Sequence, residues 1–248
     1  MQPIVLATSN AHKVEEMRAI FARRGVPVLG LTDVPAPPAG WREPDETGTT
    51  FEQNATIKAL AYAAQTGRAC LADDSGLDID ALAGRPGVIS SHYFNDGRTD
   101  GPAAGMSRAE RDARNNARVL RELEGVAPEA RSARFVCVMA VAGISAPRGA
   151  STGQRDAGPT AAQGKIPTPT LLFLARGTFE GRIGTPPRVP AGDNGFGYDP
   201  LFLVAPDFAR TGAELGSDEK NARSHRARAA EQVAAWIAAN ATLLTREA

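Results

Sequence analysis

Apolar residues along this chain recur with two different periods, which predicts strands and helices in alternation. Residues 3–7 form a short apolar run typical of a buried strand. In residues 11–24, Val14, Met17 and Phe21 recur at helical spacing, so this segment is predicted as a helix with one apolar face. A strand followed at once by a helix is typical of an α/β protein.

The rest of the chain continues this alternation. Further strands are predicted over residues 69–72, 77–82, 135–144 and 170–179. Further helices are predicted over residues 50–67, 107–125 and 218–239. The helix over 107–125 is expected to turn Ala113, Leu120 and Leu123 inward. We therefore expect an α/β fold with a central twisted mixed sheet flanked by helices, in two lobes with an active-site cleft between them.

Residues 145–169 interrupt the pattern. They are rich in Gly, Pro, Ser, Thr and Gln and contain almost no large apolar side chain, which is typical of a surface excursion. Elsewhere, the sequence shows no linker between two apolar cores and no internal repeat. We therefore predict one domain over residues 1–248, with residues 145–169 as a surface insertion.

The balance of charges excludes one class of partner. Lys and Arg together number 28, as do Asp and Glu, so this chain of 248 residues has no general positive field to hold long nucleic acid. No apolar run approaches the ~20 residues of a membrane-spanning helix, and residues 1–7 lack the layout of a signal peptide. Cys70 and Cys137 lie in apolar runs, which indicates buried thiols and not a disulfide. A cytoplasmic protein without membrane partners is expected.

The first candidate site is the start of the first helix. Thr8, Ser9 and Asn10 follow a predicted strand, and Lys13 lies in the first helical turn. Unpaired N–H groups and the positive end of a helix dipole favour phosphate there, and Lys13 adds a full charge. The glycines of a Walker A loop are missing. The alternative is that Asn10 only caps the helix and Lys13 only reaches solvent.

The second candidate site is the acidic sequence Asp73-Asp74-Ser75-Gly76, directly after an apolar strand. Neighbouring carboxylates repel each other, so their ionised forms need a cation or a proton between them. Hard oxygen ligands favour Mg²⁺, and three scattered histidines form no zinc arrangement. Neighbours on a regular strand point to opposite faces, so we expect one aspartate to bind the metal and position water while the other supports it. The alternative is an ordinary Asp-Ser-Gly turn.

Glu46 precedes the second predicted helix and could complete a metal shell, although a loop glutamate is usually just solvated. On that helix, Asn54 and Lys58 lie one turn apart, so both could reach one phosphate. A lysine on a helix surface more often reaches only water. These three residues are therefore compatible with a metal and phosphate site at the aspartates, but they do not establish one.

Two further segments are candidates for recognising a base. In Gly195-Phe196-Gly197-Tyr198-Asp199, glycines let the backbone approach a ligand and two aromatic rings could stack on it, although a tight aromatic turn could equally pack the core. Lys220, Ser224, His225 and Arg226 lie on the last predicted helix. On one continuous helix, His225 would lie about 140° round from Lys220, and a solvated charged face is the alternative.

Taken together, these segments resemble the inosine triphosphate pyrophosphatase family. The likeness rests on blocks that occur in the family's order from residue 4 to about residue 240. The blocks are Thr8-Ser9-Asn10 with Lys13, Phe51 to Ala59, Leu71 to Leu77, Leu82 to Val88, Phe196 to Phe202, Ala213 to Leu215, and Lys220 with Ser224-His225-Arg226. Each block is modest alone, but the ordered set is highly specific.

The resemblance implies Mg²⁺-dependent hydrolysis of ITP, dITP and XTP to the monophosphate and pyrophosphate, by a homodimer. It implies that Asp74 is the proton acceptor and a Mg²⁺ ligand, with Glu46 as a second ligand. The residues implied to hold the triphosphate are Thr8, Ser9, Asn10 and Lys13, with Lys58 assisting and Ser75 as a further substrate contact. The base and sugar pocket is implied to consist of Phe196, Gly197, Tyr198, Asp199, Lys220, His225 and Arg226.

Base selectivity has a partial explanation at this point. Hypoxanthine and xanthine carry a 6-oxo acceptor where adenine carries an amino donor, so donors from Arg226, His225 or backbone N–H groups would reject adenine. Guanine also carries the 6-oxo group, and its rejection stays unexplained. The sequence also departs from the family at Ser91-His92-Tyr93, where Ala-Arg-Tyr is common, so a basic contact is expected to be weakened or lost.

Two other functions are consistent with the same residues. One is a Maf-like pyrophosphatase for pyrimidine or modified nucleotides. The other is a nucleotide sensor without turnover, which the acidic cluster disfavours, because a binding protein gains little from carboxylates around a polyanion. Hydrolysis of dITP and XTP compared with dTTP and UTP distinguishes the first, and binding of ITP without pyrophosphate release would indicate the second.

Overall fold

The structure is a computed structural model that describes residues 2–8, 11–145 and 168–241. Its described residues form a seven-stranded sheet in the order β2-β1-β3-β5-β6-β7, with β4 paired to β3. The strands are β1 (Ile4–Leu6), β2 (Val28–Leu29), β3 (Cys70–Ile79), β4 (Pro86–Gly87), β5 (Ser132–Ser145), β6 (Thr168–Ile183) and β7 (Phe202–Val204). The helices are α1 (Ala11–Ala22), α2 (Phe51–Thr66), α3 (Arg108–Glu122), α4 (Ser217–Arg223) and α5 (His225–Ala239). The predicted α/β class is confirmed.

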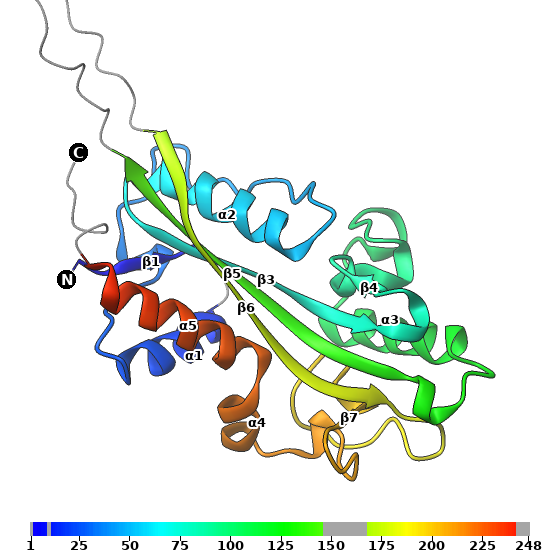
Figure 1. The fold of residues 1–248 in the computed structure, drawn as a ribbon. Helices are drawn as coiled ribbons and strands as arrows, with labels where there is room; N and C mark the ends of the chain where they lie inside the picture. Colours follow the sequence, from blue (N-terminus) through cyan, green and yellow to red (C-terminus); the bar gives the residue numbers. More distant parts are fainter. Residues whose placement is uncertain (1, 9–10, 146–167, 242–248) are drawn as a thin grey trace, which may run out of the picture.

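The sheet is mixed, as predicted. β1 pairs in parallel with both β2 and β3, whereas β3, β5, β6 and β7 pair antiparallel in succession. The three long strands β3, β5 and β6 run side by side through the whole molecule (Figure 1). Around them, β1, α1 and α5 lie toward one end, and β4, β7 and α3 lie toward the other. The sheet therefore links two groups of elements that are far apart in space.

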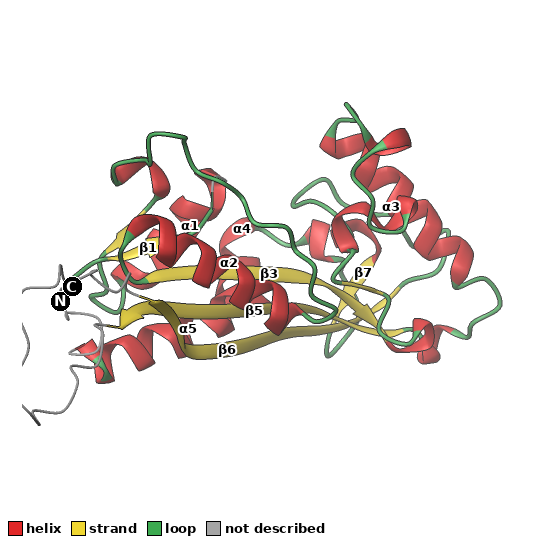
Figure 2. Cartoon of the chain, turned by 90° about the horizontal axis from the view of Figure 1, so that it is seen from above, coloured by secondary structure: helices red, strands yellow, loops and turns green. Residues whose placement is uncertain are grey.

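Helices cover both faces of this sheet (Figure 2). The alternation of side chains along β5 explains why. Cys137 and Met139 point to one face and pack with apolar residues of α1 and α5. Val136 and Val138 point to the other face and pack with α2. Both cysteines are buried free thiols, in agreement with the sequence-based interpretation.

The acidic sequence is part of a strand, so the prediction that it follows a strand end was wrong. The predicted strands over residues 69–72 and 77–82 are joined in β3, which pairs with β5 without a break from Cys70 to Ile79. Residues 80–82 are a short 3₁₀ helix instead. Polar residues are tolerated inside this strand because lysine side chains and other polar groups of the protein contact them there.

The predicted interior face of α3 was only partly right. Leu123 is buried, but Ala113 is exposed, and the buried face instead contains Asn115 and Val119. Asn115 is buried because its amide binds backbone groups of another segment: it accepts from Phe94 N–H at 2.8 Å and donates to the Ser90 carbonyl at 3.2 Å. A pattern of apolar residues alone does not reveal such a buried amide.

No helix in the described part of the chain has the length and apolar character needed to cross a bilayer. Most of the predicted insertion, residues 146–167, lies outside the described residues.

Candidate active site

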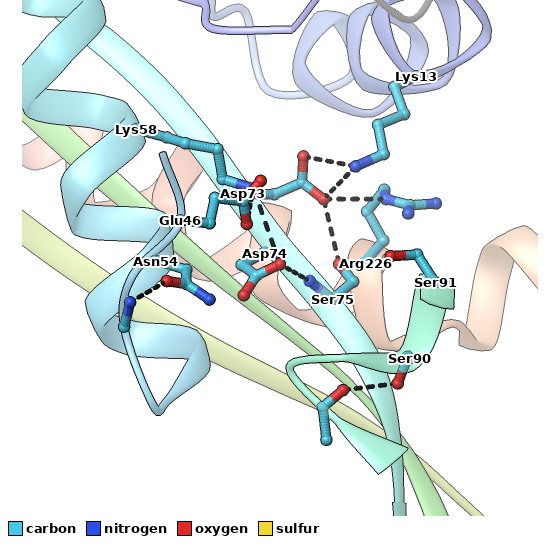
Figure 3. Close-up of polar contacts among 12 residues, drawn as sticks. Lys13, Glu46, Asn54, Lys58, Asp73, Asp74, Ser75, Ser90, Ser91 and Arg226 are labelled. Atoms are coloured by element: carbon cyan, nitrogen blue, oxygen red, sulfur yellow. Dashed lines mark hydrogen bonds and ion pairs between the residues drawn. The ribbon is translucent and has the colours of Figure 1, made fainter. Parts of the chain in front are cut away.

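Asp73 and Asp74 point to different surroundings from consecutive positions of β3 (Figure 3). The Asp73 carboxylate accepts hydrogen bonds from Lys13 Nζ at 2.9 and 3.0 Å and from Ser75 Oγ at 3.1 Å. Arg226 Nε lies 3.8 Å from the same carboxylate. Burial alone would raise the pKa of Asp73, but Lys13 and Arg226 outweigh it and hold that pKa well below its ordinary value. Asp73 is therefore a permanent anion.

Asp74 has weaker compensation. Its Oδ1 lies 3.7 Å from Lys58 Nζ and accepts the Ser75 N–H at 3.0 Å, while its Oδ2 is buried without a hydrogen-bond partner. Burial, helped by the nearby Glu46 carboxylate and opposed by Lys58, raises the pKa of Asp74 to about 6. The side chain can therefore exchange a proton near neutral pH.

The loop that carries Glu46 is tied to α2. Asn54 accepts the Gly48 N–H at 2.8 Å, and Thr50 caps the helix by accepting the Gln53 N–H at 3.2 Å. Glu46 then reaches Lys58 Nζ at 3.1 Å (Figure 3). Asn54 is only 2% exposed, so it holds this loop and is not placed to bind phosphate beside Lys58 as the sequence suggested.

Asp74 and Glu46 are suited to a divalent cation. The unpaired buried oxygen of Asp74 lacks a positive partner, and Lys58 holds both carboxylates near one point. In the described part of the chain, no three His, Cys, Asp or Glu side chains are grouped to hold a metal. Mg²⁺ commonly takes one or two carboxylates and completes its shell with water and phosphate oxygens. The two carboxylates of Asp74 and Glu46 therefore fit a Mg²⁺ site of this kind.

The predicted phosphate-binding segment is described only in part. Lys13 lies on α1 and faces Asp73, and Thr8 is the second residue after β1. Ser9 and Asn10 lie outside the described residues. Lys13 thus comes from the predicted helix, with a carboxylate partner that the sequence did not indicate.

The aromatic segment presents one ring and buries the other. Phe196 is 51% exposed, whereas Tyr198 is 4% exposed and donates from its hydroxyl to the Ser90 carbonyl at 2.7 Å. Asp199 accepts the Phe196 N–H at 2.8 Å and forms an ion pair with Lys220. Phe196 is therefore available for stacking on a ligand, while Tyr198 and Asp199 hold the loop in shape.

The helix predicted over residues 218–239 is two helices, α4 and α5, that meet at Ser224. Ser224 is extended, with φ −65° and ψ 155°, and its hydroxyl caps α5 by accepting the Ala227 N–H at 3.0 Å. The angle expected between Lys220 and His225 on one straight helix therefore does not apply. Both residues line one cavity.

The start of α5 is held close to the sheet. A Cβ atom at Gly177 of β6 would lie 2.1 Å from the His225 carbonyl oxygen, so only glycine permits this approach. The His225 ring stacks on Phe135 at 5.3 Å between centroids. Burial and the nearby cations Arg226 and Lys220 lower the pKa of His225 well below its ordinary value, so the ring is neutral at pH 7.

These elements enclose a cavity of about 370 Å³, a size that suits a small ligand. Lys13, Ser75 and Arg226 line it beside the acidic pair, and Phe196, Lys220 and His225 also line it. Asp74, Glu46 and Lys58 do not line the cavity but lie beside its Ser75 end. The predicted phosphate, metal and base residues are therefore brought together in one region.

Sequence reasoning missed the contribution of α3. Its residues Arg108, Arg111 and Asp112 also line the cavity. Arg108 lies over the Phe196 ring at 4.1 Å from the centroid, and Asp112 accepts the Gly197 N–H at 2.8 Å. The spacing of Arg108 and Asp112, one turn apart on a helix, was a signal for a shared polar face, but not for what that face contacts.

Known proteins resemble this chain over most of its length. Residues 4–236 match the Ham1 family. A dITP/XTP pyrophosphatase of Nitratidesulfovibrio vulgaris is 45% identical over 226 residues, which cover 91% of each chain. One of Geobacillus kaustophilus is 43% identical, covering 92% of this chain and 91% of its own. The structure of a HAM1 protein from Coxiella burnetii matches with a TM-score of 0.68 and 36% identity, over 96% of this chain and 100% of that one.

Proposed function

Because this chain belongs to the Ham1 family, we propose that it hydrolyses non-standard purine nucleoside triphosphates (ITP, dITP and XTP) to the monophosphate and pyrophosphate. The family resemblance inferred from the sequence is confirmed. The observation that carries the proposal is the pair of consecutive carboxylates in β3, each facing its own lysine, beside a cavity that fits a nucleoside.

The two lysines are suited to the triphosphate. Lys13 and Lys58 lie near the acidic pair, where a polyanion would otherwise be repelled. The carboxylates of Asp74, Asp73 and Glu46 raise the pKa of Lys58, although its burial acts in the opposite direction, so Lys58 stays protonated. Charge-assisted hydrogen bonds from both ammonium groups would hold the phosphates still.

Asp74 and Glu46 are the proposed ligands of Mg²⁺. When bound, the ion would neutralise charge on the phosphates and lower the barrier to attack at phosphorus. Asp74 would orient the attacking water and accept its proton, because its pKa of about 6 makes it a base that is mostly ionised at neutral pH. Asp73, bound to Lys13, would stay ionised and hold that lysine in place.

The far part of the cavity would hold the nucleoside. Phe196 would stack on the base, and Lys220, held by Asp199, lies 5.4 Å from the centre of the same ring. His225 and Arg226 would donate to the 6-oxo group, His225 from its buried, unpaired Nδ1 if that nitrogen carries the ring proton. Adenine, which has an amino donor at C6, would leave those donors unpaired.

Assembly and location follow from the family resemblance. We propose a cytoplasmic homodimer in which each chain forms one pyrophosphatase domain, with the active site in a cleft between two lobes. Size-exclusion chromatography with light scattering tests the dimer.

The test of function is pyrophosphate release by the purified chain. We expect rapid release from dITP and XTP in magnesium buffer, slow release from ATP and GTP, and none when a chelator removes the metal. Release from dTTP or UTP at the rate of dITP would favour a Maf-like activity instead. Binding of ITP without pyrophosphate release would indicate a sensor.

A further inference from the structure

Arg111 lies at the α3 end of the cavity with part of its guanidinium unpaired. Its Nη1 lies 3.0 Å from Nε2 of His92. Its Nε is buried and has no hydrogen-bond partner among the described residues. A buried donor without an acceptor costs free energy, so this position favours a ligand that brings an acceptor.

His92 fixes the direction of this guanidinium. An arginine side chain only donates, so Nε2 of His92 accepts and the proton of the neutral ring is on Nδ1. Ser91 Oγ lies 3.0 Å from Nδ1, where it can accept that proton. Burial and Arg111 itself lower the pKa of His92, which keeps the ring neutral. The packing of α3 thus brings together Arg111 and His92, which are 19 residues apart in the sequence.

Arg111 is also placed to face a particular edge of the base. The sugar of a purine nucleotide is attached to N9, so C2, N1 and C6 form the edge farthest from the triphosphate. Lys13 belongs to α1 and Arg111 to α3, and these two helices lie toward opposite ends of the long strands (Figure 1). A nucleotide with its phosphates at Lys13 would therefore direct its C2–N1–C6 edge toward Arg111.

Two acceptors of residues that line the cavity are already engaged. The Ser90 carbonyl accepts from the Tyr198 hydroxyl at 2.7 Å, and Asp112 accepts the Gly197 N–H at 2.8 Å. Among the α3 residues that line the cavity, the buried polar atom without a partner in the described structure is the donor Nε of Arg111. Oδ1 of Asn116, further along α3, also has no partner, but Asn116 does not line the cavity. An oxo group on the base would satisfy Nε of Arg111, whereas an amino group would not.

On the basis of the proposed function, we propose that Arg111 determines specificity at C2 of the purine by donating to the 2-oxo group of xanthine. Hypoxanthine has only hydrogen at C2, and guanine has an amino donor that would face the guanidinium without a hydrogen bond. All three bases share the 6-oxo group, so contacts at C6 cannot separate GTP from XTP. Arg111 supplies the missing discrimination against guanine.

The test is the substitution Arg111→Met, with Arg121→Met as the matched control. Arg121 lies on the same helix, is exposed and does not line the cavity. Steady-state pyrophosphate release gives kcat/KM for XTP, ITP and GTP. Arg111→Met is expected to lower kcat/KM for XTP about tenfold or more, to lower that for ITP much less, and not to lower that for GTP. Arg121→Met should leave all three values unchanged.

Binding of XMP, IMP and GMP by calorimetry provides a readout without turnover, and the loss should be confined to XMP. If Arg111→Met fails to fold, Arg111→Lys tests the same contrast, because lysine keeps the charge but lacks Nε; a selective loss for XTP is again expected. An equal loss of kcat/KM for all three nucleotides would overturn the inference about Arg111. The proposed function would still hold in that case, provided that the wild-type protein turns over XTP and ITP. A wild-type protein that cleaves neither XTP nor ITP would overturn both.

Discussion

Asp73 and Asp74 are consecutive residues of one strand, yet one is bonded to Lys13 at 2.9 Å and the other lies 3.7 Å from Lys58 with one oxygen unpaired. Strand geometry produces this difference, because neighbouring side chains point to opposite faces of a sheet. Two identical groups thus receive opposite pKa shifts. Such a separation is typical of carboxylates with different roles in one site.

Replacing Asp74 by asparagine should remove turnover without unfolding the protein. The amide cannot accept the proton from water and is a poor ligand for Mg²⁺, so kcat for dITP should fall about 100-fold or more. Pyrophosphate release measures this, and circular dichroism monitors the fold. The exposed Asp100 offers the control Asp100→Asn, which should behave as wild type. A near-normal rate in Asp74→Asn would contradict the role of Asp74.

The same substitution should stabilise the metal-free protein. The pKa of Asp74 is about 6 in the folded state and about 3.9 when unfolded. The stability contributed by the protonated group is therefore lost as the pH rises through 6. At pH 7.5 in chelator, Asp74→Asn should be more stable by about 2 kcal/mol, with a smaller gain at pH 5. Thermal unfolding at both pH values measures this, and a less stable variant at pH 7.5 would refute it.

Replacing Lys13 by alanine should weaken substrate binding more than chemistry. Its ammonium would bind phosphate equally in the ground and transition states, so KM should rise about tenfold while kcat changes less. Stability should also fall, because Asp73 loses its 2.9 Å partner and retains Ser75 and Arg226. Steady-state kinetics and unfolding curves test both, with Lys13→Arg as the charge-conserving control. An unchanged KM would exclude the phosphate role.

Ser224→Ala should affect both stability and affinity. The hydroxyl that caps α5 is lost, which should cost about 1 kcal/mol in the free energy of unfolding. Because His225 and Arg226 begin that helix, KM for ITP should also rise. Ser217→Ala serves as the control, because Ser217 is exposed at the start of α4 and the N-cap of that helix is Gly216. Equal effects of the two substitutions would contradict the role of Ser224.

The sequence predicted those parts of the fold that depend on apolar periodicity. The apolar faces of α1 and α5 are buried as expected, including Met17, Phe21, Val233 and Ile237. The acidic strand was not recognised, because a charged pair inside a sheet is stable only when distant lysines face it. Similarly, the apolar pattern around Ser224 did not predict that the helix is interrupted there.

The candidate site shows the same division. Ordered motifs indicated Lys13 and the segments at Phe196 and His225, which line one cavity, and Asp74, which lies beside it. The part played by α3 was missed, because Arg111 lies in no motif and its partner His92 is 19 residues away in the sequence. Pairings of that kind are set by tertiary packing.

The glycine at position 177 has a consequence for any attempt to redesign the substrate range. With the His225 carbonyl 2.1 Å from where a methyl carbon would be, the first turn of α5 rests directly on the main chain of β6. Substitutions at His225 or Arg226 should therefore change the side chain while the backbone of α5 stays in place. A larger residue at position 177 would instead displace the first turn of α5, and the side chains of that turn would move together.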